Sequence, residues 1–179
     1  MNFFYLHPFP TFNAKYHNNK HVVKMCIEYA QILSTAKRVL DGSSRLLPSP
    51  KNGKLTKVYI INKDEGEEII YKATHINHPI SKWARESRGN YELLRDHWLA
   101  ILEEYTFRYG RVHACASKAP YLQKPPTNIP KGHVTPPPSC VPDDCKNSEN
   151  PIYNYRRCYM KHKRHIADWK KRSPPGWFV

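Results

Sequence analysis

The chain has 179 residues, and its 29 lysines and arginines outnumber its 15 aspartates and glutamates, which gives a formal net charge of +14 at pH 7. No apolar run approaches the ~18 residues of a membrane span, and the first residues lack the basic and apolar regions of a signal peptide. We therefore expect a single soluble domain in the cytoplasm. A positive surplus of this size attracts polyanions, and nucleic acid is the commonest polyanion inside a cell.

The first helical pattern runs from about residue 18 to residue 40, where apolar residues recur every three or four positions. Asn18 or Asn19 can cap the start of this helix, and Asp41-Gly42 is a suitable end.

A small β-hairpin is predicted after this helix, at about residues 54–72. Residues 43–52 are polar and contain prolines, which is typical of a loop. Two β-prone runs follow at 55–61 and 68–71, separated by the turn-prone segment 62–66. We expect the hairpin to lie on the surface.

A second long helical pattern extends from Pro79 to Tyr109. Proline suits the first turn of a helix, Gly89 marks a potential break, and Gly110 is a natural end. Trp83, in the first turns, has the spacing of a core residue.

The last third of the chain changes in composition. Residues 115–151 are rich in proline and predict an extended segment that either wraps the domain or is mobile. A final helix is predicted over about 152–172, followed by a tail whose aromatic residues tuck back onto the core. The sequence thus predicts a mainly α, compact single domain of three to four helices, with a small β-hairpin insertion and a Pro-rich extended segment.

Five polar residues form one stripe along the first predicted helix: His21, Lys24, Glu28, Gln31 and Thr35. The simplest interpretation is a solvated helix face with a Lys24–Glu28 ion pair, which contributes little stability. The alternative is catalytic, because a base, an ammonium group and a carboxylate on one line suit proton transfer near a phosphate.

Basic residues gather in two further places. His78, Arg85 and Arg88 surround the start of the second predicted helix, where free N–H groups favour anions. Residues 151–179 hold eight lysines and arginines against Asp168, which is about half of the positive surplus. The residues that we expect to hold nucleic acid are Lys20, His78, Arg85, Arg88, Arg156, Arg157, Lys161, Arg164, Lys170 and Lys171.

The five cysteines argue against a disulfide framework, because their number is odd and no export signal precedes them. Cys140, Cys145, Cys158 and His162 are residue types that ligate zinc, although the Cys140-x4-Cys145 spacing is loose and free thiols are the commoner state. Our main interpretation therefore includes no metal and no cofactor.

Several short motifs, in their order and spacing, resemble the phage endonuclease V type of pyrimidine dimer DNA glycosylase and its bacterial relatives. They are the run from His21 to Glu28, the Asn77-His78-Pro79 segment with Trp83 and Leu94, the stretch from Glu104 to Gly110, and an aromatic C-terminus. The chain is also similar to a widespread set of phage proteins that share His-Val-Val-Lys-Met, His-Pro and Glu-Tyr-x-x-Arg-Tyr-Gly.

This resemblance implies an all-helical enzyme that cuts the N-glycosidic bond of a damaged base and then nicks the strand. It carries the family's catalytic glutamate onto Glu28, with His21 seven residues before it. An amine attacks C1′ of the sugar to form a Schiff base, while the carboxylate assists base departure and later removes a proton. The sequence departs from the family at Asn2, which is too large for easy removal of the preceding methionine, and at Ile27, where an arginine is expected.

The identity of the nucleophile is therefore open at this point. It can be the α-amine of Met1 or the side chain of Lys24 or Lys20, or Glu28 can activate water without a covalent step. Our leading hypothesis is a base-excision enzyme, with or without abasic-site lyase activity, that acts on damaged or modified pyrimidines in double-stranded DNA. The alternatives are a non-catalytic nucleic-acid-binding accessory protein and an enzyme that acts on free nucleotides.

Overall fold

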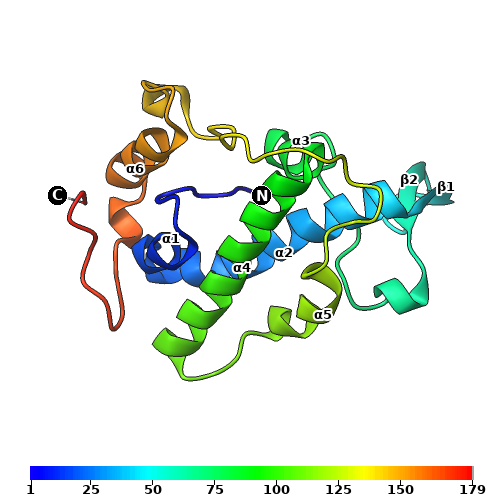
Figure 1. The fold of residues 1–179 in the computed structure, drawn as a ribbon, viewed down its shortest axis with the longest axis horizontal. Helices are drawn as coiled ribbons and strands as arrows, with labels where there is room; N and C mark the ends of the chain where they lie inside the picture. Colours follow the sequence, from blue (N-terminus) through cyan, green and yellow to red (C-terminus); the bar gives the residue numbers. More distant parts are fainter. Residues whose placement is uncertain (179) are drawn as a thin grey trace.

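The computed structural model describes residues 1–178 and has a mainly helical fold with one two-stranded antiparallel sheet. Two long helices, α2 (Asn19–Asp41) and α4 (Arg88–Tyr109), cross at the centre, and the start of the chain runs beside them (Figure 1). The other α-helices are α1 (Pro10–Tyr16), α3 (Pro79–Glu86), α5 (Ala119–Leu122) and α6 (Pro151–His162). The 3-10 turns are η1 (Lys63–Glu65), η2 (Ala114–Lys118), η3 (Asp143–Cys145) and η4 (Arg164–Ile166).

The predicted helix over 18–40 is confirmed as α2. The Asn18 side chain caps the helix by accepting a hydrogen bond from the His21 N–H. The helix ends at Gly42, where a Cβ atom would lie 2.8 Å from the Ile60 carbonyl oxygen and also collide with the Arg38 carbonyl. Glycine is required there because β2 passes so close to the helix end.

The second predicted helix is two helices that meet at Ser87. Pro79 occupies the first turn of α3, and Ser87 both ends α3 and caps α4 by accepting a hydrogen bond from the Asn90 N–H. The break therefore lies two residues before the predicted break at Gly89. Gly110 ends α4 in the left-handed conformation, with φ of 68°, as predicted.

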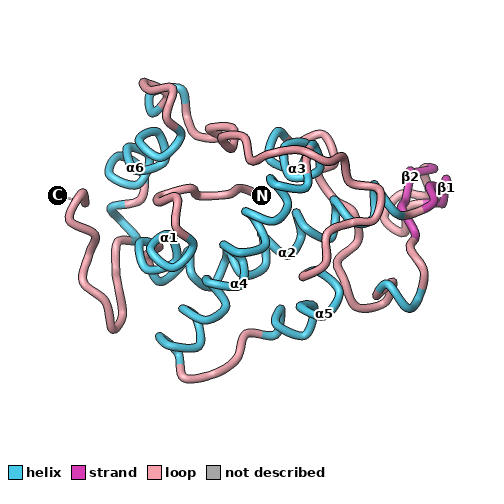
Figure 2. The backbone as a smooth tube through the Cα atoms, viewed as in Figure 1, coloured by secondary structure: helices cyan, strands magenta, loops and turns pink. Residues whose placement is uncertain are grey.

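The strand predicted at residues 55–61 is confirmed as β2 (Leu55–Ile60), but its partner was predicted wrongly. Strand β1 (Ser43–Pro48) pairs with β2, whereas residues 68–70 form a turn and a bend. The connecting turn at residues 49–53 contains Gly53 with φ of 69°, and the N–H groups of residues 52 and 53 donate to the Ser49 carbonyl. This turn folds the preceding polar residues back along β2, and both strands lie mostly exposed at one end of the molecule (Figure 2).

Arg38 anchors the hairpin and the loop that follows it to α2. Its buried guanidinium donates to the carbonyl groups of Tyr59, Glu67, Ile70 and Tyr71 and forms an ion pair with the Glu67 carboxylate. Because five fixed donors match these acceptors, arginine suits this position better than lysine would.

The Pro-rich segment wraps the domain, which decides between the two predicted alternatives. It crosses the junction of α3 and α4, where the Gly89 N–H donates to the Gly132 carbonyl and the Trp83 indole N–H donates to Thr135. The Asn90 side chain exchanges hydrogen bonds with Thr135 as well. These contacts hold an extended chain against the helices without regular secondary structure.

The final helix is shorter than predicted, because α6 ends at His162 and not near residue 172. After η4 the chain turns back toward the start of α2, where the Asn19 N–H donates to the Asp168 carbonyl at 2.8 Å. Trp177 then packs against Tyr159 and Phe178 against Trp169, so the aromatic tail does return to the core, as predicted. No helix among residues 1–178 is long and apolar enough to cross a membrane.

Candidate functional site

Glu28, near the middle of α2, is a buried carboxylate that faces the first residues of the chain. Its side chain is 10% exposed, and Oε1 lies 3.9 Å from the α-amino nitrogen of Met1. Oε2 accepts a 2.7 Å hydrogen bond from the backbone N–H of Asn2. The ammonium group of Lys24, one turn earlier on the helix, lies 3.1 Å from Oε1. A carboxylate and two amines therefore meet beneath the start of the chain.

The Asn2 side chain fixes this arrangement from the opposite side. Its Oδ1 atom accepts a 2.9 Å hydrogen bond from the Tyr155 hydroxyl, and its Nδ2 atom donates to the Cys140 carbonyl at 2.8 Å. The Tyr155 hydroxyl in turn accepts from the Cys140 N–H. Residues from α6 and from the Pro-rich segment thus hold the start of the chain against α2.

The stripe predicted on α2 is not a solvated helix face. Glu28 is covered by residues 1–3, and the Thr35 hydroxyl donates to the Thr74 carbonyl and accepts from the Thr74 N–H. Gln31 is half-buried, and Lys24 remains 63% exposed. The polar stripe is therefore an interface with other segments of the chain, open to solvent mainly at Lys24.

His21, the third predicted catalytic residue, lies two helical turns before Glu28 and belongs to an aromatic cluster. Its Nδ1 atom is 2.5 Å from the Tyr159 hydroxyl, and its ring lies 4.5 Å from that of Phe4. Burial, followed by the charge of His17, lowers the pKa of His21 to about 2. The structure therefore places a neutral imidazole in the core and not against the carboxylate.

His78 lies at the N-terminus of α3, where its Nδ1 atom accepts a hydrogen bond from the Ile80 N–H. Burial lowers the pKa of His78, and the Met1 ammonium group lowers it further, whereas the Glu28 carboxylate acts in the opposite direction. His78 therefore lies close enough to the Met1 amine and the Glu28 carboxylate to be affected by both charges.

The other basic residues predicted near this site divide into two kinds. Arg85 is turned inward, because its guanidinium donates to the carbonyl groups of Ile76 and Ser81 at 2.8 and 2.9 Å. It therefore braces the segment before α3. Arg88 is exposed and pairs with Glu92, and Lys20 is exposed on α2.

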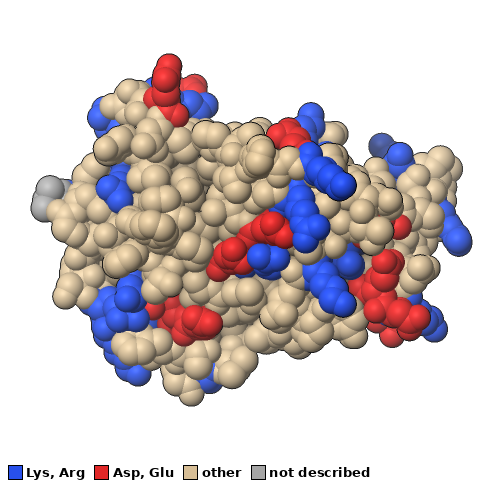
Figure 3. All heavy atoms as spheres, viewed as in Figure 1, with Lys and Arg blue, Asp and Glu red and all other residues tan. Residues whose placement is uncertain are grey.

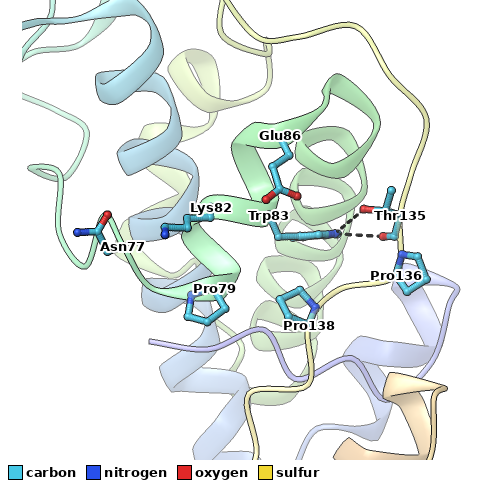
Figure 4. Close-up of a pocket in the computed structure, with 8 residues that line it drawn as sticks. All are labelled: Asn77, Pro79, Lys82, Trp83, Glu86, Thr135, Pro136 and Pro138. Atoms are coloured by element: carbon cyan, nitrogen blue, oxygen red, sulfur yellow. Dashed lines mark hydrogen bonds between the residues drawn. The ribbon is translucent and has the colours of Figure 1, made fainter.

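A cavity of about 400 Å³ lies beside α3 and borders this neighbourhood (Figure 4). Figure 4 shows Asn77 and Lys82 on one side of Trp83 and Thr135 on the other, where it accepts from the indole nitrogen. The Pro138 carbonyl on its wall accepts from the Tyr155 hydroxyl, which also bonds Asn2. The residues that line the cavity are Asn77, Pro79, Lys82, Trp83, Glu86, Thr135, Pro136 and Pro138.

The C-terminal basic side chains are largely engaged within the protein. Arg156 lies over the Trp177 ring, Lys170 over the Tyr109 ring, and Lys171 donates to the Phe107 carbonyl. Contacts with rings and carbonyl groups leave the positive charges uncompensated, so these residues still attract anions. The other residues that we predicted to hold nucleic acid also have contacts within the protein: Arg157 donates to the Asp144 carbonyl, Lys161 forms an ion pair with the Asp144 carboxylate, and Arg164 lies over the Phe178 ring.

The surplus charge does not form one uniform patch. Acidic side chains lie between basic ones over the middle of the face shown in Figure 3. The hairpin is a basic element that our sequence analysis overlooked, because residues 43–60 contain Arg45, Lys51, Lys54 and Lys57 and no acidic residue.

The stretch from Glu104 to Gly110, which contributed to the family resemblance, has a structural role. The Glu104 carboxylate is 4% exposed and binds Arg108 at 2.7 Å and Arg172 at 2.9 Å. Tyr105 and Tyr109 lie with their ring centres 4.8 Å apart. This motif closes α4 onto the C-terminal tail and supplies no group to the Glu28 site.

Comparison of the chain with protein-family models, with curated proteins and with solved structures gave no match.

Asn2 and Tyr155 are the members of the site that sequence analysis missed as site residues. Asn2 lies 26 positions from Glu28, and Tyr155 lies 153 positions from Asn2, so no local spacing connects them. The α-amine of Met1, in contrast, was among the predicted nucleophiles. Cys140 lies here as well, through its backbone groups, and therefore apart from the other predicted zinc ligands.

Proposed function

We propose that the protein is a DNA base-excision enzyme in which an amine at the start of the chain attacks the sugar and Glu28 transfers the protons. The observation that carries this proposal is the contact of the Glu28 carboxylate with the Met1 α-amine at 3.9 Å and with the Asn2 nitrogen at 2.7 Å. The resemblance to the endonuclease V type of glycosylase and the net charge of +14 support the same proposal.

The chemistry needs an amine and a carboxylate on the same side of one sugar. The amine nitrogen attacks C1′, and the bond from C1′ to the base breaks, so that the base leaves with the bonding electrons and takes up a proton. The sugar then opens to a Schiff base. A carboxylate next to the amine can remove the proton from C2′, after which the bond to the 3′ phosphate breaks. Glu28 is adjacent to the amines that this sequence requires.

Three nitrogens compete for the role of nucleophile. The Met1 α-amine lies 3.9 Å from the carboxylate on a residue whose side chain is buried, and the Lys24 ammonium is exposed and 3.1 Å away. The Asn2 nitrogen is the nearest, at 2.7 Å, but it is an amide in this chain and becomes an amine only if Met1 is removed. We favour an α-amine, because it is held between Glu28 and the Asn2–Tyr155 contact.

Borohydride trapping tests the proposal and identifies the nucleophile. The protein is incubated with ultraviolet-irradiated, base-modified and abasic duplexes, with and without borohydride. We expect strand cleavage and a trapped adduct, and digestion should place that adduct on the peptide that begins at Met1 or Asn2. An adduct on the peptide that contains Lys24 would assign the lysine instead.

Two matched pairs of variants serve as controls. Glu28→Gln should abolish cleavage and trapping but retain DNA binding, whereas Glu103→Gln, an exposed acidic residue on α4, should change neither. Lys24→Gln is compared with Lys20→Gln, and both should still be trapped. Absence of cleavage, abasic product and adduct on every duplex would contradict the proposal.

A non-catalytic DNA-binding protein is the second candidate, and the basic hairpin at residues 43–60 favours it. A two-stranded ribbon fits the major groove, and its lysines and arginine can contact phosphates. In that case the wild-type protein and Glu28→Gln bind DNA equally well, with a steep dependence on salt, and neither forms product.

A further inference from the structure

A second cluster of chemically reactive side chains lies at the far end of the Pro-rich segment, where η3 meets α6. The carboxylate of Asp144, the thiol of Cys145 and the imidazole of His162 all lie within 4.8 Å of one another. Asp144 and Cys145 come from η3, and His162 is the last residue of α6. The candidate active site uses none of them.

Two distances within this cluster match edges of a zinc tetrahedron. His162 Nε2 lies 3.1 Å from Asp144 Oδ1, and the Cys145 sulfur lies 3.5 Å from the same oxygen. Zinc bonds of about 2.0–2.1 Å to nitrogen and oxygen and about 2.3 Å to sulfur give edges of roughly 3.3 Å between N and O and 3.5 Å between S and O. The Asp144 oxygen is thus already spaced from the His162 nitrogen and from the Cys145 sulfur as ligands of one ion are.

Cys158 is the candidate for the fourth ligand, and its side chain must turn toward the other three, which alone among the described residues have ligand atoms within 4.8 Å of one another. It lies one turn before His162 on α6, so both side chains emerge on the same face of the helix. Cys145 and Cys158 are both buried free thiols, which removes them from most competing reactions with solvent.

We propose that Asp144, Cys145, Cys158 and His162 bind a structural zinc ion. Two thiolates and an imidazole select zinc over calcium or magnesium, which prefer oxygen ligands. The set retains three of the four residues that the sequence analysis considered, and Asp144 replaces Cys140.

Two cations from α6 contact Asp144. Lys161 Nζ lies 3.1 Å from Asp144 Oδ2, the oxygen that does not contact the Cys145 sulfur, so it can orient the carboxylate while Oδ1 binds the ion. The carbonyl of Asp144 accepts from Arg157. These two cations also offset the negative charge of two thiolates and a carboxylate around one zinc.

The consequence for the fold is a clamp between the Pro-rich segment and α6. Asn154, on the same helix, already binds the backbone of residues 147 and 148. A zinc ion would fix the segment at a second point. Because the preceding residue Cys140 and α6 residue Tyr155 both hold Asn2, this clamp lies between elements that shape the Glu28 site.

The metal content of the full-length protein, purified under reducing conditions, tests this proposal. Mass spectrometry of the digested protein should detect about one zinc per chain. Replacement by Co²⁺ should give the absorption bands of thiolate ligation in tetrahedral geometry. His162→Gln and Asp144→Asn change exposed side chains and should fold, and each should weaken zinc binding by about 10-fold or more in competition with a chelator.

Matched controls separate ligation from loss of folding. His165→Gln changes an exposed histidine three residues from His162, and Cys115→Ser changes a buried cysteine outside the cluster; both should retain zinc. Cys145→Ser and Cys158→Ser should lose it. The proposal is overturned if the reduced protein binds no zinc on titration, if His162→Gln and Asp144→Asn bind zinc as tightly as the wild type, or if Cys145 and Cys158 form a disulfide in the native protein.

Discussion

The two central helices each bury one glutamate, and the two carboxylates have opposite surroundings. Glu104 on α4 is bound by the guanidinium groups of Arg108 and Arg172. Glu28 on α2 is bound by a backbone N–H and by two amines, those of Met1 and Lys24. Arginine stays protonated and holds a carboxylate with a rigid fork, whereas an amine can lose its proton and attack carbon.

The comparison shows why burial alone does not identify a catalytic carboxylate. Burial raises the pKa of Glu104, but the hydrogen bonds from Arg172 and Arg108 outweigh it and hold the pKa below its usual value. A carboxylate in that state is fixed as an anion and suits a structural role. Glu28 lies beside nitrogens that can react, which suits proton transfer.

The largest expected effect is a loss of activity, and it distinguishes Glu28 from Glu104. Glu28→Gln should lower base-excision activity by about 10²–10⁴-fold, the usual contribution of a general acid or base. It should change the free energy of unfolding by less than about 1.5 kcal/mol, because the amide oxygen still accepts from Asn2. Cleavage assays and urea denaturation on the same preparation measure both. If Glu28→Gln loses activity only because most of the protein is unfolded, Glu28 has a structural role like that of Glu104.

The reverse result is expected for the other glutamate. Glu104→Gln should destabilise the protein by about 3–5 kcal/mol, because it leaves the fully buried Arg108 without its anionic partner. Any folded fraction should keep the wild-type rate of product formation. Urea denaturation of Glu104→Gln beside the exposed variant Glu103→Gln gives the difference directly. Equal stability of the two variants would show that the Glu104 cluster is dispensable.

The difference in stability between wild type and Glu104→Gln should depend on pH in a defined way. Because the folded pKa of Glu104 lies below its usual value of 4.5, its stabilisation is present above about pH 4.5 and is lost as the pH falls through the folded pKa. The stability difference between wild type and Glu104→Gln should therefore be constant near neutral pH and shrink only in acid. A difference that shrinks between pH ~7 and ~6 would implicate other groups.

Buried histidines should also lower the stability of both wild type and Glu104→Gln in acid, independently of Glu104. Burial lowers the pKa of His17 to about 4 and that of His97 to about 3. The unfolded chain takes up protons at these positions below about pH 6.5, whereas the folded chain does not, so stability falls as the pH drops below that value. Thermal unfolding from pH ~8 to ~5 measures the fall in wild type and in Glu104→Gln alike.

The smallest effect should come from the contact that positions the start of the chain. Tyr155→Phe removes the hydroxyl that binds Asn2 and should cost about 1–2 kcal/mol of stability, because the half-buried Asn2 amide loses one of its hydrogen-bond partners. It should also reduce borohydride trapping while leaving DNA binding unchanged. Tyr153→Phe, two residues earlier and exposed on the same helix, is the matched control.

Long helices were the elements that the sequence predicted best. The pattern from Asn18 to Gly42 combines regular apolar spacing with a capping residue and a glycine, and Pro79 and Gly110 delimit the second pattern in the same way. Strand β2 was predicted from its β-prone residues, but β1 lacks such a signal, because it is exposed on both faces and its residues do not alternate. The hairpin was therefore given the wrong partner strand.

Tertiary contacts explain the other differences. The final helix ends early because Asn19 on α2 binds the backbone at Asp168 and turns the chain away. At the candidate site, the carboxylate and the amines were predictable from residue type, family resemblance and spacing. Their assembly was not, because Asn2 reaches Glu28 through contacts with Tyr155 and Cys140 that no sequence pattern encodes.

The contacts of Arg38 determine which segments of the molecule can unfold locally. Its guanidinium ties the base of the hairpin and the following loop to α2, so those segments can separate only when a fully buried side chain is exposed. Backbone amides near Tyr59 and Tyr71 should therefore exchange with solvent only through near-global unfolding. Amides at the hairpin turn near Gly53 lie beyond this anchor and should exchange by local fraying. One arginine thus sets the boundary of a cooperative folding unit.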